Sequence, residues 1–208
     1  KILGNFLFRL AGLKPDWNMS SFIERKAEEI RRLVGNEKII CGLSGGVDSL
    51  VASLIIHKAI GRRLTCIFVD NGFLRKGQYH DLMDKFREKL SLNVDGVDAA
   101  DEFIDALGGV TSPERKRKII GGLFIRIFER QARKIGGVKF LAQGTIYPDV
   151  IESNPVKGPS STIKSHHNVG GLPKDLKFEL VEPLKELFKD EVRALGLELG
   201  VDKDFIHQ

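Results

Sequence analysis

The chain has few cysteines and no long apolar run. Two cysteines, Cys41 and Cys66, occur among 208 residues, and each lies inside a short apolar segment. A disulfide framework or a zinc site needs more cysteines or a different spacing, so we expect two reduced thiols in the core and a cytoplasmic protein. A membrane-spanning helix needs roughly 20 consecutive apolar residues. No segment approaches that length, so we expect no membrane partner.

Net charge is also low, but the charges are unevenly placed. The formal net charge is +5, and between Glu114 and Lys134 eight lysine or arginine residues stand against two glutamates. A nucleic-acid-binding surface has such a basic segment, and so has a solvated helix beside an anionic nucleotide site. Phe124 and Phe128 have helical spacing and are expected in the core, so no aromatic rings are left to stack on bases. We favour the second interpretation and expect no nucleic-acid partner.

Apolar and amphipathic segments alternate along the sequence. Short apolar runs predict strands at 39–43, 64–69, 93–97, 138–142 and 178–181. Helical periodicity occurs before, between and after them, at 23–34, 48–60, 78–90, 112–135 and 188–199. This alternation predicts the α/β class, with a mostly parallel sheet and helices on both faces. In such folds ligands bind beyond the carboxyl ends of the strands.

Two local patterns add detail to this outline. Ser21 and Glu24 form a capping-box pattern, which predicts the start of the first long helix. Residues 144–173 contain proline, glycine and polar side chains without periodicity. So long a segment without regular structure predicts a functional or mobile loop.

A glycine-rich turn joins the first predicted strand to the helix after it. Its sequence is Ser44-Gly45-Gly46-Val47-Asp48-Ser49. Adjacent glycines let the backbone approach a ligand closely, and the N-terminus of a helix favours an anion. The carboxylate of Asp48 repels a bare phosphate, which indicates that Mg²⁺ bridges the two. The turn has neither the lysine of a Walker A motif nor the glycine spacing of a dinucleotide fingerprint.

This hexamer resembles the SGGxDS signature of the PP-loop ATP pyrophosphatases, and it has the strand–turn–helix context of that family. The resemblance implies an adenine nucleotide alpha hydrolase-like fold. It also implies attack on the α-phosphate of ATP with release of pyrophosphate. NAD synthetase, asparagine synthetase, argininosuccinate synthetase, tRNA-thiolating enzymes and GMP synthetase share the signature, so the turn alone does not choose between them.

Further segments are similar to GMP synthetases, in the order in which that family has them. They are 68–76, 113–121, 141–153, 163–173 and 182–193. The resemblance implies a ligase that adenylylates XMP with release of pyrophosphate and then aminates it with ammonia to give GMP. The alternatives are another amidating ligase such as NAD synthetase, and an adenine-nucleotide-binding module without catalysis.

The resemblance assigns the ATP site to three parts of the chain. The backbone of the turn at 44–49 is expected to hold the phosphates of ATP. Val69 is expected to meet the adenine through its main chain. The ribose and the α-phosphate are assigned to the residues that follow the fourth strand, Gln143, Gly144 and Thr145.

Metal and catalytic residues are assigned in the same way. Asp149 and Glu152, three residues apart, are expected to join Asp48 at Mg²⁺, so the expected cofactors are ATP and Mg²⁺. A cationic lysine suits the charge that develops at the α-phosphorus. The residues assigned to this catalytic role, with Asp48, are Lys164, His166 and His167.

The XMP phosphate is assigned to an arginine. Arg75 is expected to hold it, because a guanidinium fork matches a phosphate better than a flexible ammonium does. No residue is expected to act as a covalent nucleophile. Catalysis is expected to rest on positioning and charge neutralisation.

The resemblance also implies neighbouring domains. Residues 1–19 are similar to the end of a class I glutaminase domain and the linker after it, and residues 20–208 to the ATP pyrophosphatase domain. We therefore expect ammonia from a preceding glutaminase domain. In the resembling family a C-terminal domain follows, which forms a homodimer and supplies much of the XMP site, and we expect that domain to lie beyond Gln208.

Overall fold

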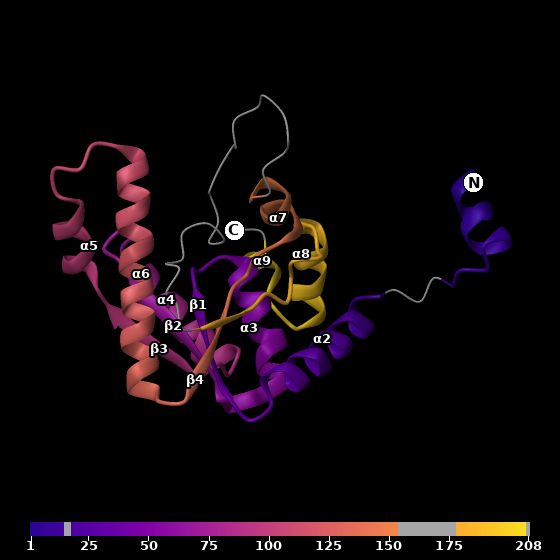
Figure 1. The fold of residues 1–208 in the computed structure, drawn as a ribbon, viewed down its shortest axis with the longest axis horizontal. Coiled ribbons are helices and arrows are strands. Elements are labelled where there is room, and N and C mark those ends of the chain that lie inside the picture. The colour runs from indigo at the N-terminus through magenta and orange to yellow at the C-terminus, as the bar shows by residue number, and fades with distance from the viewer. Residues whose placement is uncertain (15–17, 154–177, 207–208) are drawn as a thin grey trace.

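The computed structural model describes residues 1–14, 18–153 and 178–206. Its centre is a five-stranded sheet with the order β3-β2-β1-β4-β5, and all neighbouring strands pair in parallel (Figure 1). The strands are β1 Lys38–Leu43, β2 Leu64–Asp70, β3 Val94–Asp98, β4 Val138–Ala142 and β5 Glu179–Val181. The predicted class and the parallel sheet are confirmed.

Helices cover both faces of the sheet. On one face lie α2 Met19–Val34, α3 Val47–Ile60, α4 Gln78–Asp84, α8 Lys189–Glu198 and α9 Lys203–Ile206. On the other face lie α5 Ala100–Leu107 and α6 Pro113–Ile135 (Figure 1). The remaining helical segments are α1 Ile2–Gly4, α7 Tyr147–Ser153, the π-helices η1 Asn5–Leu10 and η3 Lys85–Lys89, and the 3₁₀-helix η2 Gly61–Arg63.

The central strands are buried on both sides, as their apolar composition predicts. Successive side chains of β1 point to opposite faces, so Ile39 and Cys41 pack in one hydrophobic core and Ile40 packs in the other. Cys41 lies opposite Cys66 of β2, and both thiols are free and buried. Burial raises the pKa of Cys41 to about 12, which leaves it protonated at neutral pH.

Helix α2 begins earlier than the capping-box pattern predicts. Its N-cap is Asn18, whose side-chain Oδ1 accepts a hydrogen bond from the Ser21 backbone N–H at 2.8 Å. Asparagine is as favourable at an N-cap as serine, and Asn18 has the extended backbone that the position requires. Ser21 therefore lies in the first turn, and the prediction that it caps the helix was wrong.

Helices α5 and α7 are among the helical segments that were not predicted. Helix α7 lies inside the segment 144–173, which was expected to lack regular structure. Its sequence begins Tyr147-Pro148-Asp149, and proline in the first turn with an aspartate is a common helix start. Helix α5 follows β3 and presents Phe103 to the core against α6. In the described part of the chain no helix is long and apolar enough to cross a membrane.

Candidate functional site

The glycine-rich turn runs from the end of β1 into the first residues of α3. Gly45 has φ of +83°, a left-handed conformation that favours glycine, and Gly46 is the N-cap of α3. The first intrahelical hydrogen bond runs from the Leu50 N–H to the Gly46 carbonyl. Backbone N–H groups before Leu50 have no intrahelical acceptor, which makes this end of α3 suitable for an anion.

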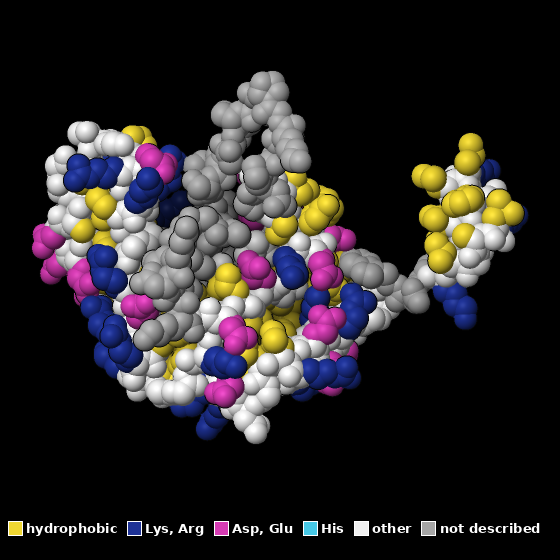
Figure 2. Space-filling model, in the orientation of Figure 1, with side chains coloured by type: hydrophobic (Ala, Val, Ile, Leu, Met, Phe, Trp, Pro, Cys, Tyr) yellow, Lys and Arg dark blue, Asp and Glu magenta, His cyan; other side chains and the backbone are white. Residues whose placement is uncertain are grey.

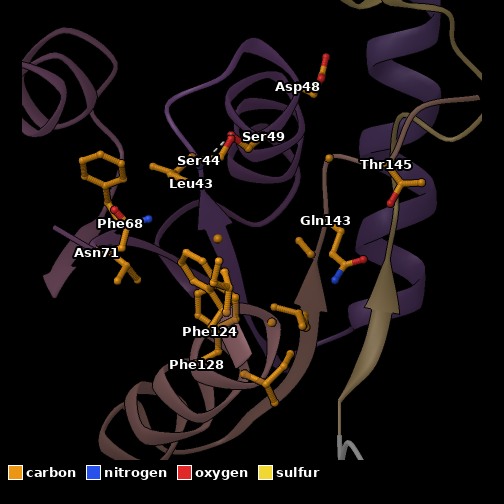
Figure 3. Close-up of a pocket in the computed structure, with 18 of the residues that line it drawn as sticks. Leu43, Ser44, Asp48, Ser49, Phe68, Asn71, Phe124, Phe128, Gln143 and Thr145 are labelled. Carbon is orange, nitrogen blue, oxygen red and sulfur yellow. Dashed lines mark hydrogen bonds between the residues drawn. The ribbon is translucent and has the colours of Figure 1, made fainter. Parts of the chain in front are cut away.

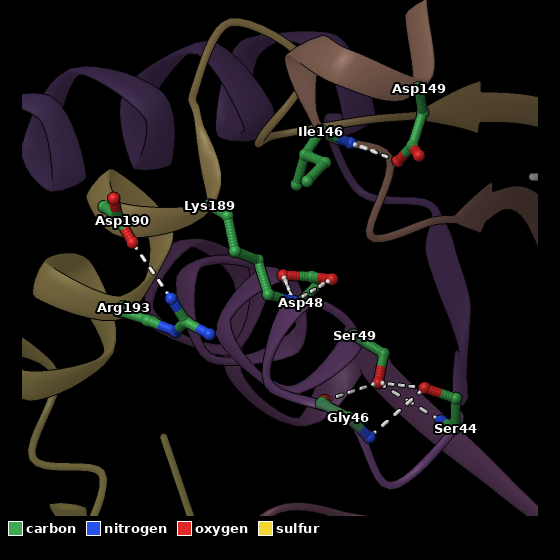
Figure 4. Close-up of polar contacts among 9 residues, drawn as sticks. All are labelled: Ser44, Gly46, Asp48, Ser49, Ile146, Asp149, Lys189, Asp190 and Arg193. Atoms are coloured by element: carbon green, nitrogen blue, oxygen red, sulfur yellow. Dashed lines mark hydrogen bonds and ion pairs between the residues drawn. The ribbon is translucent and has the colours of Figure 1, made fainter. Parts of the chain in front are cut away.

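The two serines of the turn bind each other and the turn backbone (Figure 4). The Ser49 hydroxyl donates to the Gly46 carbonyl at 3.0 Å and accepts from the Ser44 N–H at 3.1 Å. The Ser44 hydroxyl accepts from the Gly46 N–H at 3.3 Å and lies 3.1 Å from the Ser49 hydroxyl. Because Ser49 already donates its proton to Gly46, Ser44 is the donor between the two hydroxyls. These bonds hold the turn in one shape.

A cavity of about 800 Å³ opens at the carboxyl ends of β1, β2 and β4 (Figure 3). This volume is within the range of small-molecule sites. Most of the residues assigned to ATP and metal line it, namely Ser44, Asp48, Ser49, Val69, Gln143, Gly144, Thr145 and Asp149. The structure thus brings together side chains from three separate segments of the sequence.

Other assigned residues lie elsewhere. Gly45, Gly46 and Val47 belong to the turn but are not among the described residues that line the cavity. The same holds for the exposed side chains of Arg75, in the loop after β2, and of Glu152, on α7. Three assigned catalytic residues fall outside the residues that the structure describes, and they are Lys164, His166 and His167.

Asp48 forms an ion pair across the mouth of the cavity. Both oxygens of its carboxylate accept from the Lys189 Nζ at 2.7 Å, and Lys189 is the first residue of α8 (Figure 4). Both residues line the cavity, with 28% of the Asp48 side chain and 40% of the Lys189 side chain exposed. The pair places a positive and a negative charge beside the first turn of α3.

Sequence reasoning missed three kinds of residue at this site. Lys189 is one, and Arg117 on α6 is a second cation that lines the cavity. The third is a pair of rings, Phe124 and Phe128, which we expected in the core. They pack against the core with part of each ring and line the cavity with the rest (Figure 3). The spacing of Arg117, Phe124 and Phe128 along one helix face was the available signal.

Two glycines make room for the walls of the cavity. A Cβ atom on Gly144 would lie 2.7 Å from the Ser49 backbone N and 2.8 Å from the Asp48 carbonyl carbon. The loop after β4 therefore packs directly on the glycine-rich turn at 44–49, which only glycine permits. A Cβ atom on Gly42 would lie 2.7 Å from the ring of Phe128, so β1 and α6 also pack closely here.

The loop after β4 is held by the end of β5 and by the segment that follows it. The Gln143 N–H donates to the Val181 carbonyl at 3.0 Å, and the Tyr147 N–H donates to the Leu187 carbonyl at 2.9 Å. Between these bonds, the Thr145 hydroxyl donates to Glu182 Oε1 at 2.6 Å. The side-chain oxygen of Gln143 is buried and has no hydrogen-bond partner among the described residues.

The carboxylates that face the cavity set limits on a metal site. Asp48 is paired with Lys189, and Asp149 accepts from the Ile146 N–H at 3.0 Å. The described ranges contain no group of three or more side chains that could hold a metal ion. Mg²⁺ at a nucleotide takes one or two carboxylates and completes its shell with phosphate oxygens and water. Two carboxylates lining one cavity fit that requirement, provided that Asp48 leaves Lys189.

Known proteins match this chain over nearly its whole length. A family model described as NAD synthase matches residues 19–120. The glutamine-hydrolysing GMP synthase of Caldicellulosiruptor saccharolyticus is 58% identical over 207 residues, which are 99% of this chain and 40% of that protein. That of Clostridium tetani is 60% identical over 201 residues, which are 97% of this chain and 39% of that protein. The chain thus spans about two fifths of the length of these curated relatives.

A solved structure has the same fold. The NH3-dependent NAD synthetase of Campylobacter jejuni aligns with a TM-score of 0.71 and 15% identity, over 92% of this chain and 77% of that chain. At this identity the likeness supports the fold alone. The predicted SGGxDS turn, the parallel sheet and the sequence relatives agree with one another. The chain is therefore similar to the NAD synthase family over residues 19–120, and to the corresponding two fifths of the GMP synthases over nearly its whole length.

Proposed function

We propose that this chain is the synthetase part of a glutamine-hydrolysing GMP synthase. In this proposal the C2 oxygen of XMP attacks the α-phosphorus of ATP, and the bond to the leaving pyrophosphate breaks. Ammonia then attacks C2 of adenylyl-XMP, and AMP leaves with the C2 oxygen. The observation that carries the proposal is the SGGxDS turn at the wall of a nucleotide-sized cavity, in a chain that is 58% identical to a GMP synthase.

The two ends of the cavity differ in polarity, which suggests an orientation for ATP. The phosphates belong at the N-terminus of α3, where free backbone N–H groups and Lys189 offer positive charge. The adenine belongs at the apolar end, between the backbone of Val69 and the rings of Phe124 and Phe128. The ribose then lies near the loop after β4.

Charge neutralisation is the main task of the side chains at the phosphates. Lys189 is free to move from Asp48 to a phosphate oxygen, because its ammonium has three donors on a flexible stem. Asp48 and Asp149 would hold Mg²⁺, which neutralises phosphate charge when it is bound. Arg117 lines the cavity, whereas Arg75 does not, so we favour Arg117 for the XMP phosphate, with its guanidinium leaving Glu114, which it contacts at 3.0 Å.

The parts of the proposal that concern neighbouring domains rest on the relatives. A class I glutaminase domain before residue 20 would supply ammonia, and a dimerisation domain after the chain would complete the XMP site. Residues 2–10 support the first part, because their apolar side chains are exposed in the described structure (Figure 2). These side chains are Ile2, Leu3, Phe6, Leu7, Phe8 and Leu10. Exposed apolar residues of this number suit a protein interface.

A substrate screen tests the proposal. The chain replaces the corresponding region of the Caldicellulosiruptor saccharolyticus GMP synthase, and pyrophosphate release is measured with ATP and ammonium. The second substrate is XMP, nicotinate adenine dinucleotide or tRNA, and the unaltered synthase is the control. We expect pyrophosphate release when XMP is the second substrate, and none with the other two. Release with nicotinate adenine dinucleotide instead would assign the chain to NAD synthesis, and ATP binding without any release would indicate a binding module.

A further inference from the structure

The hydroxyl of Thr145 uses its only proton in a hydrogen bond to Glu182. Thr145 lines the cavity and is 5% exposed, and its Oγ1 lies 2.6 Å from Glu182 Oε1. A carboxylate is an acceptor only, so the hydroxyl must be the donor in this contact. The threonine oxygen then keeps its lone pairs for a second partner and has no proton to give to it.

Glu182 is well placed to accept this hydrogen bond. It directly follows β5 and is half-buried, and within the described ranges Thr145 is its hydrogen-bond donor and no lysine or arginine pairs with it. A charged acceptor forms a short and strong hydrogen bond. The carboxylate therefore fixes the direction of the Thr145 hydroxyl.

This arrangement decides which ligand groups the loop after β4 accepts. A phosphate oxygen needs a donor, and here it would meet an acceptor with a carboxylate behind it. A hydroxyl or amine of a ligand needs an acceptor, and Thr145 offers one. We propose that Glu182 is a positioning residue that makes Thr145 an acceptor for a ribose hydroxyl of the bound nucleotide. The inference rests on the proposed function, since it requires that ATP binds in this cavity.

The position of Thr145 supports the ribose as its partner. Gly144, the residue before it, packs on the backbone of Asp48 and Ser49, so Thr145 is next to the glycine-rich turn. The ribose of ATP lies between the phosphates and the adenine. It therefore passes the loop after β4 if the phosphates are at α3 and the base is at the apolar end.

If Glu182 only supported the fold, its replacement would destabilise the protein without changing which ligand it prefers. The end of β5 and the segment after it are already tied to the loop by the backbone bonds from Gln143 to Val181 and from Tyr147 to Leu187. Those bonds remain when the carboxylate is replaced. We therefore expect Glu182→Gln to fold normally and to alter the choice of ligand.

Nucleotide binding by the 208-residue chain tests the inference. Titration calorimetry compares ATP with 2′-deoxy-ATP and 3′-deoxy-ATP, and thermal unfolding confirms that each variant is folded. We expect the unsubstituted chain to bind ATP about tenfold more tightly than one of the two analogues, the cost of an unpaired hydrogen-bonding group. Thr145→Val, which removes the hydroxyl at constant shape, should abolish that preference, and Thr145→Ser should retain it.

The Glu182 variant distinguishes positioning from support. The amide of Glu182→Gln can donate to the Thr145 oxygen and compete with the ligand, so we expect the preference for ATP to fall at least threefold. An unchanged preference in Glu182→Gln, or no preference in the unsubstituted chain, would overturn the inference while leaving the proposed function intact. Failure to bind ATP at all would overturn the proposed function, and the inference with it.

Discussion

Lys189 Nζ lies 2.7 Å from both carboxylate oxygens of Asp48, although the two residues are 141 positions apart. Asp48 belongs to the first turn of α3 and Lys189 to the first turn of α8. The contact joins the glycine-rich turn at 44–49 to the start of α8. It also keeps the negative charge of Asp48 from facing a triphosphate alone.

Replacing Asp48 and replacing Lys189 should change the affinity for ATP in opposite directions when Mg²⁺ is absent. Asp48→Asn leaves an unpaired cation, so we expect ATP to bind about tenfold more tightly, or about 1.4 kcal/mol. Lys189→Met leaves an unpaired carboxylate and should weaken binding by a similar factor. Both side chains are partly exposed, so both effects should shrink as ionic strength rises. Calorimetric titration at low and high salt measures them.

Lys185→Met is the matched control, because Lys185 is an exposed lysine four residues before Lys189 and lies outside the described lining of the cavity. With Mg²⁺ present, Asp48→Asn should gain little from the metal, and turnover in the substituted synthase should fall. Weaker binding of metal-free ATP by Asp48→Asn would contradict this account of the pair.

A methyl group at Gly144 should disturb the glycine-rich turn at 44–49. Its Cβ would lie within 2.8 Å of backbone atoms of Asp48 and Ser49, which cannot rotate away. We expect Gly144→Ala to lower the free energy of unfolding by about 1–3 kcal/mol and to weaken ATP binding. Denaturant unfolding and titration measure the two effects.

Gly122→Ala on α6 is the control for this substitution. The nearest atom to its added Cβ is the end of the Arg126 side chain at 3.7 Å, so there is room for the methyl group. Alanine in a helix is favoured over glycine by up to about 1 kcal/mol, so this variant should be more stable. Equal stability of the two variants would argue against the close packing of Gly144.

Gly42 should control the position of the Phe128 ring. In Gly42→Ala the new Cβ would lie 2.7 Å from the ring, which is the movable end of a side chain. We expect the ring to turn into the cavity and ATP to bind several-fold more weakly, with little loss of stability. Phe128→Leu removes the clash, so in that background Gly42→Ala should weaken ATP binding no further. Titration of the two single variants and the double variant with ATP is the measurement, and an equal effect of Gly42→Ala in both backgrounds would contradict a role for the ring.

The ion pair between Lys26 and Glu186 should make stability depend on acid pH. Lys26 of α2 is 7% exposed, and its Nζ lies 2.9 Å from Glu186, in the segment before α8. The hydrogen bond from Lys26 lowers the pKa of Glu186 below its ordinary 4.5. A lowered carboxylate pKa stabilises the fold above the unfolded value, and this contribution is lost as the pH falls below about 4.5.

We therefore expect Glu186→Gln to be less stable than the unsubstituted chain at pH 7, by roughly 1 kcal/mol or less because Glu186 is half exposed. The difference should disappear as the pH falls below 4.5. Chemical denaturation at several pH values measures it. Glu198→Gln, an exposed glutamate on α8, should show no such dependence. A constant difference across this range would mean that the ion pair does not stabilise the fold.

Local patterns in the sequence were enough to predict the sheet and the glycine-rich turn between β1 and α3. The strands are short apolar runs because they are buried on both faces, and the predicted strand at 138–142 agrees with β4. The turn was predictable because its glycines and Asp48 are adjacent in the sequence. The buried, free state of Cys41 and Cys66 followed from their apolar surroundings.

Tertiary structure alone decided which distant side chains meet in the cavity. Helical periodicity places Phe124 and Phe128 on an apolar face, but it does not tell whether that face meets the core or a cavity. The pairing of Asp48 with Lys189 depends on α8 returning beside α3, and no local signal in the sequence encodes that contact. Sequence pattern determines which residues form each element, because the spacing of apolar residues and the residue types at helix ends are local features of the chain. The site depends on how those elements pack, because its residues come from the ends of separate strands and helices.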